Sequence, residues 1–103
     1  MGNPMKVRAR SDAGVTIVKV LMSHPMETGQ RKNDKGETIP AHFIQTVTAV
    51  HNGKVVLSAQ WGTAVSANPF LEFRFKGGAK GESVRVTWTD TKGDSRSDEA
   101  SIT

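Results

Sequence analysis

The chain has 103 residues, of which 36% are hydrophobic and 6% aromatic; its net charge is +4 and it contains no cysteine. Chains of this length form one domain and bury roughly 60–70% of the surface that they expose when unfolded, so we expect a single domain over residues 1–103. The lack of cysteine excludes disulfides, thiolate metal sites, a cysteine nucleophile and sulfur cargo linked to cysteine.

The positive charge lies in the first half of the chain. Residues 1–54 hold eight Lys or Arg against four Asp or Glu, whereas residues 55–103 hold six of each. A basic chain can bind nucleic acid, but single-strand binders interleave exposed aromatic residues with the basic ones. Because Trp61 and Trp88 fall on apolar faces, an ordinary solvated surface or contact with an acidic protein is favoured.

No segment approaches the ~20 consecutive apolar residues of a membrane helix. Nor does a cationic start precede an apolar core of the kind that a signal peptide has. Considered alone, the chain is therefore expected to be cytoplasmic or to be exported by another route.

Alternation of apolar and polar residues predicts strands at the start of the chain. The first strand has one apolar and one basic face, formed by Met5, Val7 and Ala9 and by Lys6, Arg8 and Arg10. A turn follows at Asp12-Ala13-Gly14. Residues 15–23 are apolar at both odd and even positions, which predicts a strand that is central in its sheet or covered on both faces.

Residues 42–51 predict a further strand that leads into Asn52-Gly53. This dipeptide favours a two-residue type I′ hairpin, because both residues tolerate a positive φ. The return strand is predicted to place its alternate apolar residues on one face: Val55, Leu57, Ala59 and Trp61.

Three more strands are predicted after Pro69. The first directs Leu71, Phe73 and Phe75 inward; a glycine-rich turn at 77–81 then leads to a strand with Val84, Val86 and Trp88 on one face. After a turn at 90–94, a weak last strand uses Ala100 and Ile102. About seven strands with turns between them, and no sustained helical period, predict an all-β, immunoglobulin-like antiparallel β-sandwich.

Motifs for catalysis or for binding a cofactor are missing from the sequence. It has no nucleotide fingerprint, no P-loop and no Ser-His-Asp order. His42 and His51 fall on opposite faces of one predicted strand, about 30 Å apart, so they cannot share a metal ion unless the strand contains a bulge. We therefore expect no catalytic, cofactor-binding or metal-binding residues, and no enzymatic activity.

The segment from Ser23 to Lys32 begins a connection that exceeds ordinary hairpin loops in length. It is either a long structural loop held by Pro25 and Gly29, or a partner surface. In the second case Met26 supplies an adaptable apolar contact and charged neighbours supply a polar rim. The residues alone leave these two interpretations open.

Four segments together resemble one known family in order and spacing over essentially the whole chain. They are Leu21-Met22-Ser23-His24-Pro25-Met26-Glu27-Thr28-Gly29-Gln30-Arg31-Lys32, His51-Asn52-Gly53-Lys54-Val55-Val56, Val65-Ser66-Ala67-Asn68-Pro69 and Val86-Thr87-Trp88-Thr89-Asp90-Thr91-Lys92-Gly93-Asp94. The chain resembles the SoxZ family, subunits of the bacterial sulfur-carrier complex of thiosulfate oxidation. This resemblance implies the same sandwich class.

The resemblance also implies a partner and a location. SoxZ forms a heterodimer with SoxY, whose C-terminal arm ends in a glycine-flanked cysteine that carries sulfur between the periplasmic Sox enzymes. This chain would then be the non-catalytic scaffold, exported together with the signal-bearing partner. Partner contacts are expected at His24, Pro25, Met26, Glu27, Thr28, Gly29, Asn68 and Pro69. The alternative function is a generic immunoglobulin-like binding module that is unrelated to sulfur transfer.

Overall fold

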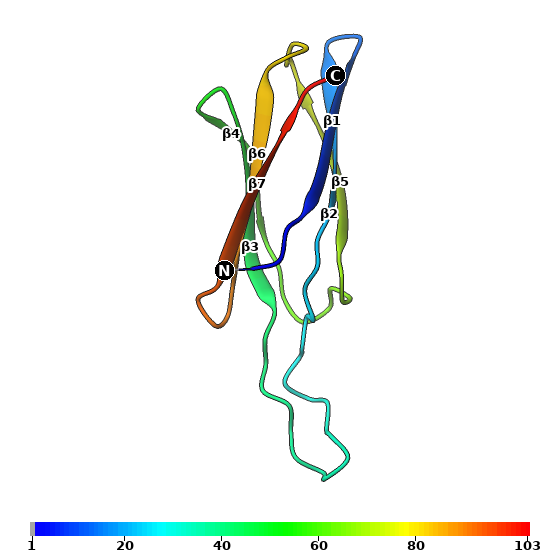
Figure 1. The fold of residues 1–103 in the computed structure, drawn as a ribbon, viewed down its shortest axis with the longest axis vertical. Coiled ribbons are helices and arrows are strands. Elements are labelled where there is room, and N and C mark those ends of the chain that lie inside the picture. Colours follow the sequence, from blue (N-terminus) through cyan, green and yellow to red (C-terminus); the bar gives the residue numbers. More distant parts are fainter. Residues whose placement is uncertain (1) are drawn as a thin grey trace.

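The computed structural model describes residues 2–103, which form seven strands in two antiparallel sheets and contain no helix (Figure 1). The strands are β1 (Lys6–Asp12), β2 (Val15–Leu21), β3 (Ile44–His51), β4 (Lys54–Gln60), β5 (Phe70–Lys76), β6 (Ser83–Asp90) and β7 (Ser95–Ser101). The prediction of an all-β sandwich of about seven strands is therefore confirmed. The described residues therefore include no membrane-spanning helix.

The two sheets contribute one face each to the core. Their strand orders are β1-β2-β5 and β4-β3-β6-β7. Residues at alternate positions of the strands point between the sheets, as the period of two requires. The most deeply buried include Val18, Val20, Val47, Ala49, Val84, Val86 and Trp88. The predicted inner faces of the first strand and of the strands after Pro69 are confirmed.

Two tight turns follow directly from local sequence. Asn52 and Gly53 have φ values of 49° and 73°, and they connect β3 to β4 as a two-residue hairpin. Ala13 and Gly14 connect β1 to β2 in the same way, with φ values of 50° and 83°. Turns of this hand suit the right-handed twist of the paired strands.

The predicted face of β4 is wrong at its first residues. The ladder between β3 and β4 pairs Ala49 with Leu57 but Val50 with Val55, so β4 contains one extra residue at this point. Such a bulge turns the residues beyond it to the opposite face. Val55 is consequently 58% exposed, whereas Val56 is partly buried against the core.

Strand β2 is central, since it pairs with β1 on one edge and with β5 on the other. Its inner face is completely covered: Thr16, Val18 and Val20 are fully buried. Its outer face is not covered by any other part of residues 2–103, and Leu21 is 43% exposed there. Of the two predicted possibilities, the central position is thus confirmed, and coverage on both faces is not found among the described residues.

Candidate partner-binding surface

The connection between β2 and β3 forms a narrow arm. Backbone hydrogen bonds join its two halves at Glu27 and His42 (2.7 Å, Glu27 N to His42 O) and again at Arg31 and Ile39 (2.8 Å, Ile39 N to Arg31 O). Figure 1 shows that this arm extends well beyond the sheets at one end, and the molecule measures 54 × 21 × 19 Å. The arm therefore presents a surface that the sandwich alone would lack.

The foot of the arm is held by one carboxylate. His24 Nε2 lies 3.0 Å from Asp90 Oδ2, and His42 Nε2 lies 2.7 Å from the same oxygen. The second oxygen, Oδ1, accepts hydrogen bonds from the backbone of Lys92 and Asp94 at 3.0 and 2.9 Å. Asp90 thereby joins both halves of the arm to the turn between β6 and β7.

The charge state of Asp90 follows from these contacts. Burial raises its pKa, because a charged group is disfavoured away from water. Hydrogen bonds from His24, from the backbone of Asp94, from His42 and from the backbone of Lys92 act in the opposite direction, and the net effect lowers the pKa of Asp90 to about 2. The group is therefore a carboxylate at physiological pH, although its residue is only 4% exposed.

The same three residues have to be tested as a metal site, because their ligand-type atoms lie within 4.8 Å of one another. His24 Nδ1 accepts a hydrogen bond from the backbone N–H of Met26 at 3.1 Å. A neutral imidazole that accepts at Nδ1 carries its proton at Nε2, and that proton points at Asp90. His24 thus has no free lone pair for an ion, and the cluster fits a structural hydrogen-bond network.

Sequence reasoning did not detect this cluster. The sequence suggested a comparison of His42 with His51, because both fall in one predicted strand. In the structure His51 Nε2 instead forms a hydrogen bond with Glu82 Oε1 at 2.8 Å. His24 and Asp90 lie 66 positions apart. No local spacing signals such a contact; only the juxtaposition of the arm and the turn after β6 creates it.

The two loops that carry the predicted partner residues do meet. The backbone of Asn68 donates to His24 O at 2.9 Å, and the Asn68 side chain accepts from His24 N at 3.1 Å. Pro69 O accepts from Met22 N at 2.9 Å. Met26 and Asn68 have φ values of 49° and 52°, a left-handed conformation that packing must maintain for methionine.

Exposure separates the predicted residues into three groups. His24, Met26 and Pro69 are buried, Glu27, Thr28 and Gly29 are half-buried, and Pro25 and Asn68 are exposed. The Met26 side chain is of special interest, because its residue is 5% exposed and its sulfur accepts a hydrogen bond from Ile44 N at 3.4 Å. In this conformation Met26 serves the core, so a partner would contact mainly its neighbours.

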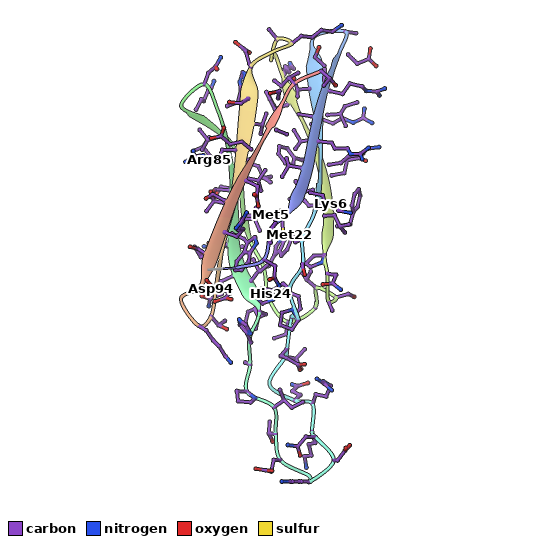
Figure 2. All side chains as sticks on the ribbon, in the orientation of Figure 1. Met5, Lys6, Met22, His24, Arg85 and Asp94 are labelled. Carbon is purple, nitrogen blue, oxygen red and sulfur yellow. The ribbon has the colours of Figure 1, made fainter. Side chains whose placement is uncertain are left out.

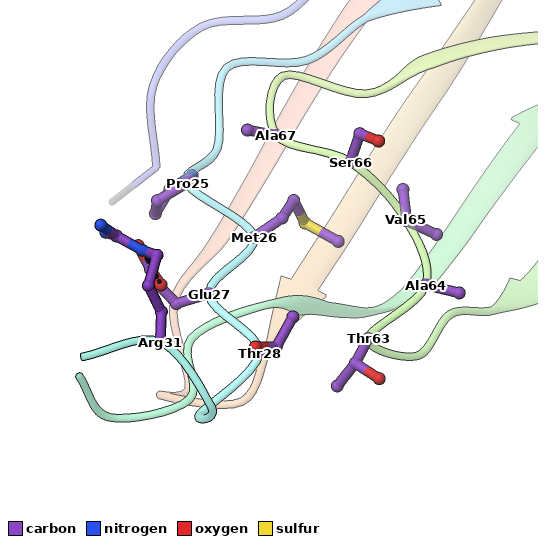
Figure 3. A pocket seen from close by; sticks show the side chains of 10 residues that line it. All are labelled: Pro25, Met26, Glu27, Thr28, Arg31, Thr63, Ala64, Val65, Ser66 and Ala67. Atoms are coloured by element: carbon purple, nitrogen blue, oxygen red, sulfur yellow. Dashed lines mark hydrogen bonds and ion pairs between the residues drawn. The ribbon is translucent and has the colours of Figure 1, made fainter. Parts of the chain in front are cut away.

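Those neighbours line a hollow of about 270 Å³ between the two loops. Figure 3 shows Pro25, Glu27, Thr28 and Arg31 along one wall and residues 63–67 along the other. Arg31 forms an ion pair with Glu27 and thereby lowers the pKa of that carboxyl. Arg31 belongs to the charged rim that the sequence predicted, whereas residues 63–65 of the opposite wall were not among the predicted partner residues.

Comparison with solved structures supports the fold. The chain is similar to a variant superoxide reductase (neelaredoxin) from Archaeoglobus fulgidus in the reduced form, with a TM-score of 0.59 and 19% identity. That alignment covers 99% of this chain and 87% of the other, and it shows shared architecture alone. No curated protein sequence matches the chain.

Comparison with protein families is more specific. The model of the family described as "Sulphur oxidation protein SoxZ" matches residues 5–101, which is nearly the full length. The matched region contains every strand and both loops of the candidate surface. The chain therefore belongs to the SoxZ family of sulphur oxidation proteins.

Proposed function

We propose that this chain is the non-catalytic scaffold subunit of a heterodimeric sulfur-carrier complex in thiosulfate oxidation. Its partner would be a SoxY-type subunit, whose cysteine carries the sulfur intermediates. The observation that supports this most strongly is the SoxZ family match over residues 5–101. The composition is consistent with it, because covalent carriage by a thiolate requires a cysteine and none of the 103 residues is one.

In this proposal the hollow between the two loops is a recognition surface for the partner or for the enzymes that act on its cargo. Its size suits a short segment of another chain rather than a whole domain. Its walls are held in place by the Asp90 network and by the backbone bonds between Asn68 and His24. A surface that is ordered before binding loses less conformational freedom when a partner arrives.

The proposal extends to location. We expect the folded pair to be exported together to the periplasm on the signal of the partner. Expressed alone, this chain would stay in the cytoplasmic fraction, and co-expression with a signal-bearing SoxY-type subunit would move it to the periplasmic fraction. Periplasmic recovery of the chain without that subunit would contradict this route.

One experiment tests the carrier role directly. The chain is co-expressed with a SoxY-type subunit, purified, and exposed to thiosulfate and the Sox oxidising enzymes; native and intact mass spectrometry follow. We expect a one-to-one complex in which only the SoxY-type subunit gains mass. Absence of a complex, or a covalent sulfur adduct on this chain, would refute the proposed function.

A further inference from the structure

The outer face of the β1-β2-β5 sheet concentrates positive charge. Its six cations are Lys6, Arg8, Arg10, Lys19, Arg74 and Lys76, all exposed, and only two carboxylates, Asp12 and Glu72, accompany them. The excess on this face equals the net charge of the entire chain, which is +4. In Figure 2, Lys6 and other nitrogen-tipped side chains of this sheet extend away from the four-stranded sheet.

This arrangement is unfavourable for folding. Arg8 and Lys19 are direct partners in the β1–β2 ladder, and like charges placed opposite each other destabilise a sheet. Within residues 2–103, Lys19 is the one cation of the face that has an ion pair, a 4.0 Å contact with Glu72. None of the other five cations forms an ion pair with a residue of this described range.

Apolar side chains lie among these cations. Ile17 is half-buried and pairs with Arg10 of β1 on one side and with Arg74 of β5 on the other. Leu21 pairs with Phe70 of β5. Leu21 and Phe70 are 43% and 61% exposed. Leu21 and Ile17 lie on the outer face of β2, the strand that is apolar at both odd and even positions. The sandwich buries only the inner set of these apolar residues.

The outer face of the other sheet provides a contrast. Its Arg85 donates two hydrogen bonds to Glu99, the shorter of them 2.6 Å long. Nearby, Thr87 and Ser97 share a hydrogen bond of 2.7 Å between their hydroxyls. These polar groups on neighbouring strands form hydrogen bonds with one another, so they offer few unpaired charges to a partner.

The basic face also contains a hollow suited to acidic side chains. It has a volume of about 350 Å³, and its lining consists of Arg8, Ala9, Arg10, Ile17, Lys19 and Thr103. Two guanidinium groups beside an ammonium group can bind carboxylates through charge-assisted, bidentate hydrogen bonds. Ile17 supplies an apolar floor of the kind found at the centre of protein interfaces, where arginine is also enriched.

We propose that this basic outer face of the β1-β2-β5 sheet is the surface on which the SoxY-type subunit docks, through an acidic patch with apolar residues at its centre. The identity of the partner rests on the proposed function; the position and the charge rest on the structure. A protein fits better than a nucleic acid, because Phe70 is the one aromatic side chain on this face, whereas strand-binding surfaces need several for base stacking. The face would set the subunit contact, and the loop hollow would remain free for shorter segments.

The test measures binding and stability on the same charge-reversal variants. Arg8→Glu and Arg10→Glu are compared with the matched control Lys54→Glu, which lies at the start of β4 in the other sheet and changes the net charge equally. Association with the purified SoxY-type subunit is followed by surface plasmon resonance at low and high salt. We expect Kd to rise about tenfold or more for both arginine variants, largely through slower association, and to change little for Lys54→Glu.

Arg8→Glu should weaken binding without lowering the thermal stability of the chain. Because Arg8→Glu replaces a like-charge pair with Lys19 by an opposite-charge pair, its melting temperature should equal or exceed that of the wild type. Weaker binding can then not be attributed to misfolding. Phe70→Ala provides a further check, since loss of an exposed apolar contact should speed dissociation without changing the salt dependence.

The outcomes distinguish the two proposals. If the wild-type chain does not bind the subunit, both the proposed function and this inference fail. If the wild type binds and Arg8→Glu and Arg10→Glu bind equally well, only the inference fails. Tighter binding of a DNA duplex or of phosphatidylglycerol vesicles than of the subunit, abolished by Arg8→Glu, would assign the face to another polyanion and overturn it as well.

Discussion

His42 and Asp90 are joined by a 2.7 Å hydrogen bond between Nε2 and Oδ2, across 48 positions of sequence. The same oxygen accepts from His24, which lies on the other half of the arm. A single carboxylate oxygen therefore fixes both halves of the arm relative to the sandwich.

Asp90→Asn should destabilise the protein by ~3 kcal/mol, because in either orientation its amide NH2 would face N–H donors, of the two histidines or of the backbone, where a carboxylate oxygen now accepts. Denaturant unfolding at neutral pH measures this loss. Asp34→Asn is the matched control, since Asp34 is exposed at the far end of the arm. Equal stabilities of the two variants would show that the network contributes nothing.

Acid should remove the stabilisation that Asp90 provides. Its pKa is about 2 in the folded chain against an ordinary value of 3.8, so the folded state binds the proton less readily than the unfolded state does. The contribution is complete above about pH 4 and is lost as pH falls towards 2, and it amounts to ~2 kcal/mol.

The comparison of wild type with Asp90→Asn isolates this effect. Glu82 also has its pKa lowered to about 2, by hydrogen bonds from Asn52, from the backbone of Ala79 and from His51, but both proteins share that contribution. The difference in unfolding free energy between them should therefore shrink as pH falls from 4 to 2. A difference that is constant over this range would contradict the assignment.

Met26→Ala should act on stability, because the side chain is buried and in contact with Ile44. Truncation of a buried methionine costs ~2–5 kcal/mol, depending on how far the site collapses. Pro25→Ala, next in the chain but exposed, should leave the thermal melt nearly unchanged. Similar melting temperatures for the two variants would show that Met26 is not part of the core in solution.

Glu27→Ala addresses recognition at the hollow between the loops. Its partner Arg31 is exposed, so loss of the ion pair should shift the melting temperature by no more than a few degrees. We expect binding to the SoxY-type subunit or to a Sox enzyme to weaken by ~1 kcal/mol or more, measured by calorimetry. Lys80→Ala, an exposed change outside these loops, serves as the control. Unchanged affinity for every partner would remove the recognition role of this wall.

Trp88→Ala should cost ~3–5 kcal/mol in denaturant unfolding, because the indole is 1% exposed and its removal leaves a cavity between the sheets. Arg85→Ala on the opposite face of β6 breaks only an exposed ion pair with Glu99 and should cost less than ~1 kcal/mol. Comparable losses would mean that the faces of β6 are reversed.

A comparison of Gly78→Ala with Gly14→Ala separates the steric from the conformational loss of stability. Both glycines have a positive φ, +86° and +83°, so alanine should cost ~1 kcal/mol at either position on conformational grounds. At Gly78 a Cβ would also lie 2.2 Å from Thr16 Oγ1, whereas at Gly14 it would meet open space. Gly78→Ala should therefore lose clearly more stability. Adding Thr16→Ala to Gly78→Ala should recover part of the stability that the steric clash costs. If no stability is recovered, the clash is not with Thr16.

Local sequence was sufficient for most of the sandwich. The alternation in β1, β5 and β6 identified their inner faces, because a strand side chain points to one side or the other with a period of two. Asn52-Gly53 identified its hairpin for a similarly local reason, the low cost of a positive φ. The motifs at residues 21–32 and 65–69 indicated the SoxZ family, although the sequence did not show that these two loops lie together.

Tertiary structure alone decided the rest, because each remaining feature depends on where distant segments pair. The bulge that exposes Val55 belongs to the ladder between β3 and β4 and not to either strand by itself. Met26 is buried because Ile44 and the core lie beside it, and Asp90 accepts from His24 and His42 only because the foot of the arm lies beside the turn after β6. Likewise, the apolar pattern of β2 predicted a strand that is central or covered on both faces; the order of the sheets makes it central and leaves its outer face open, with the chain's excess positive charge around it.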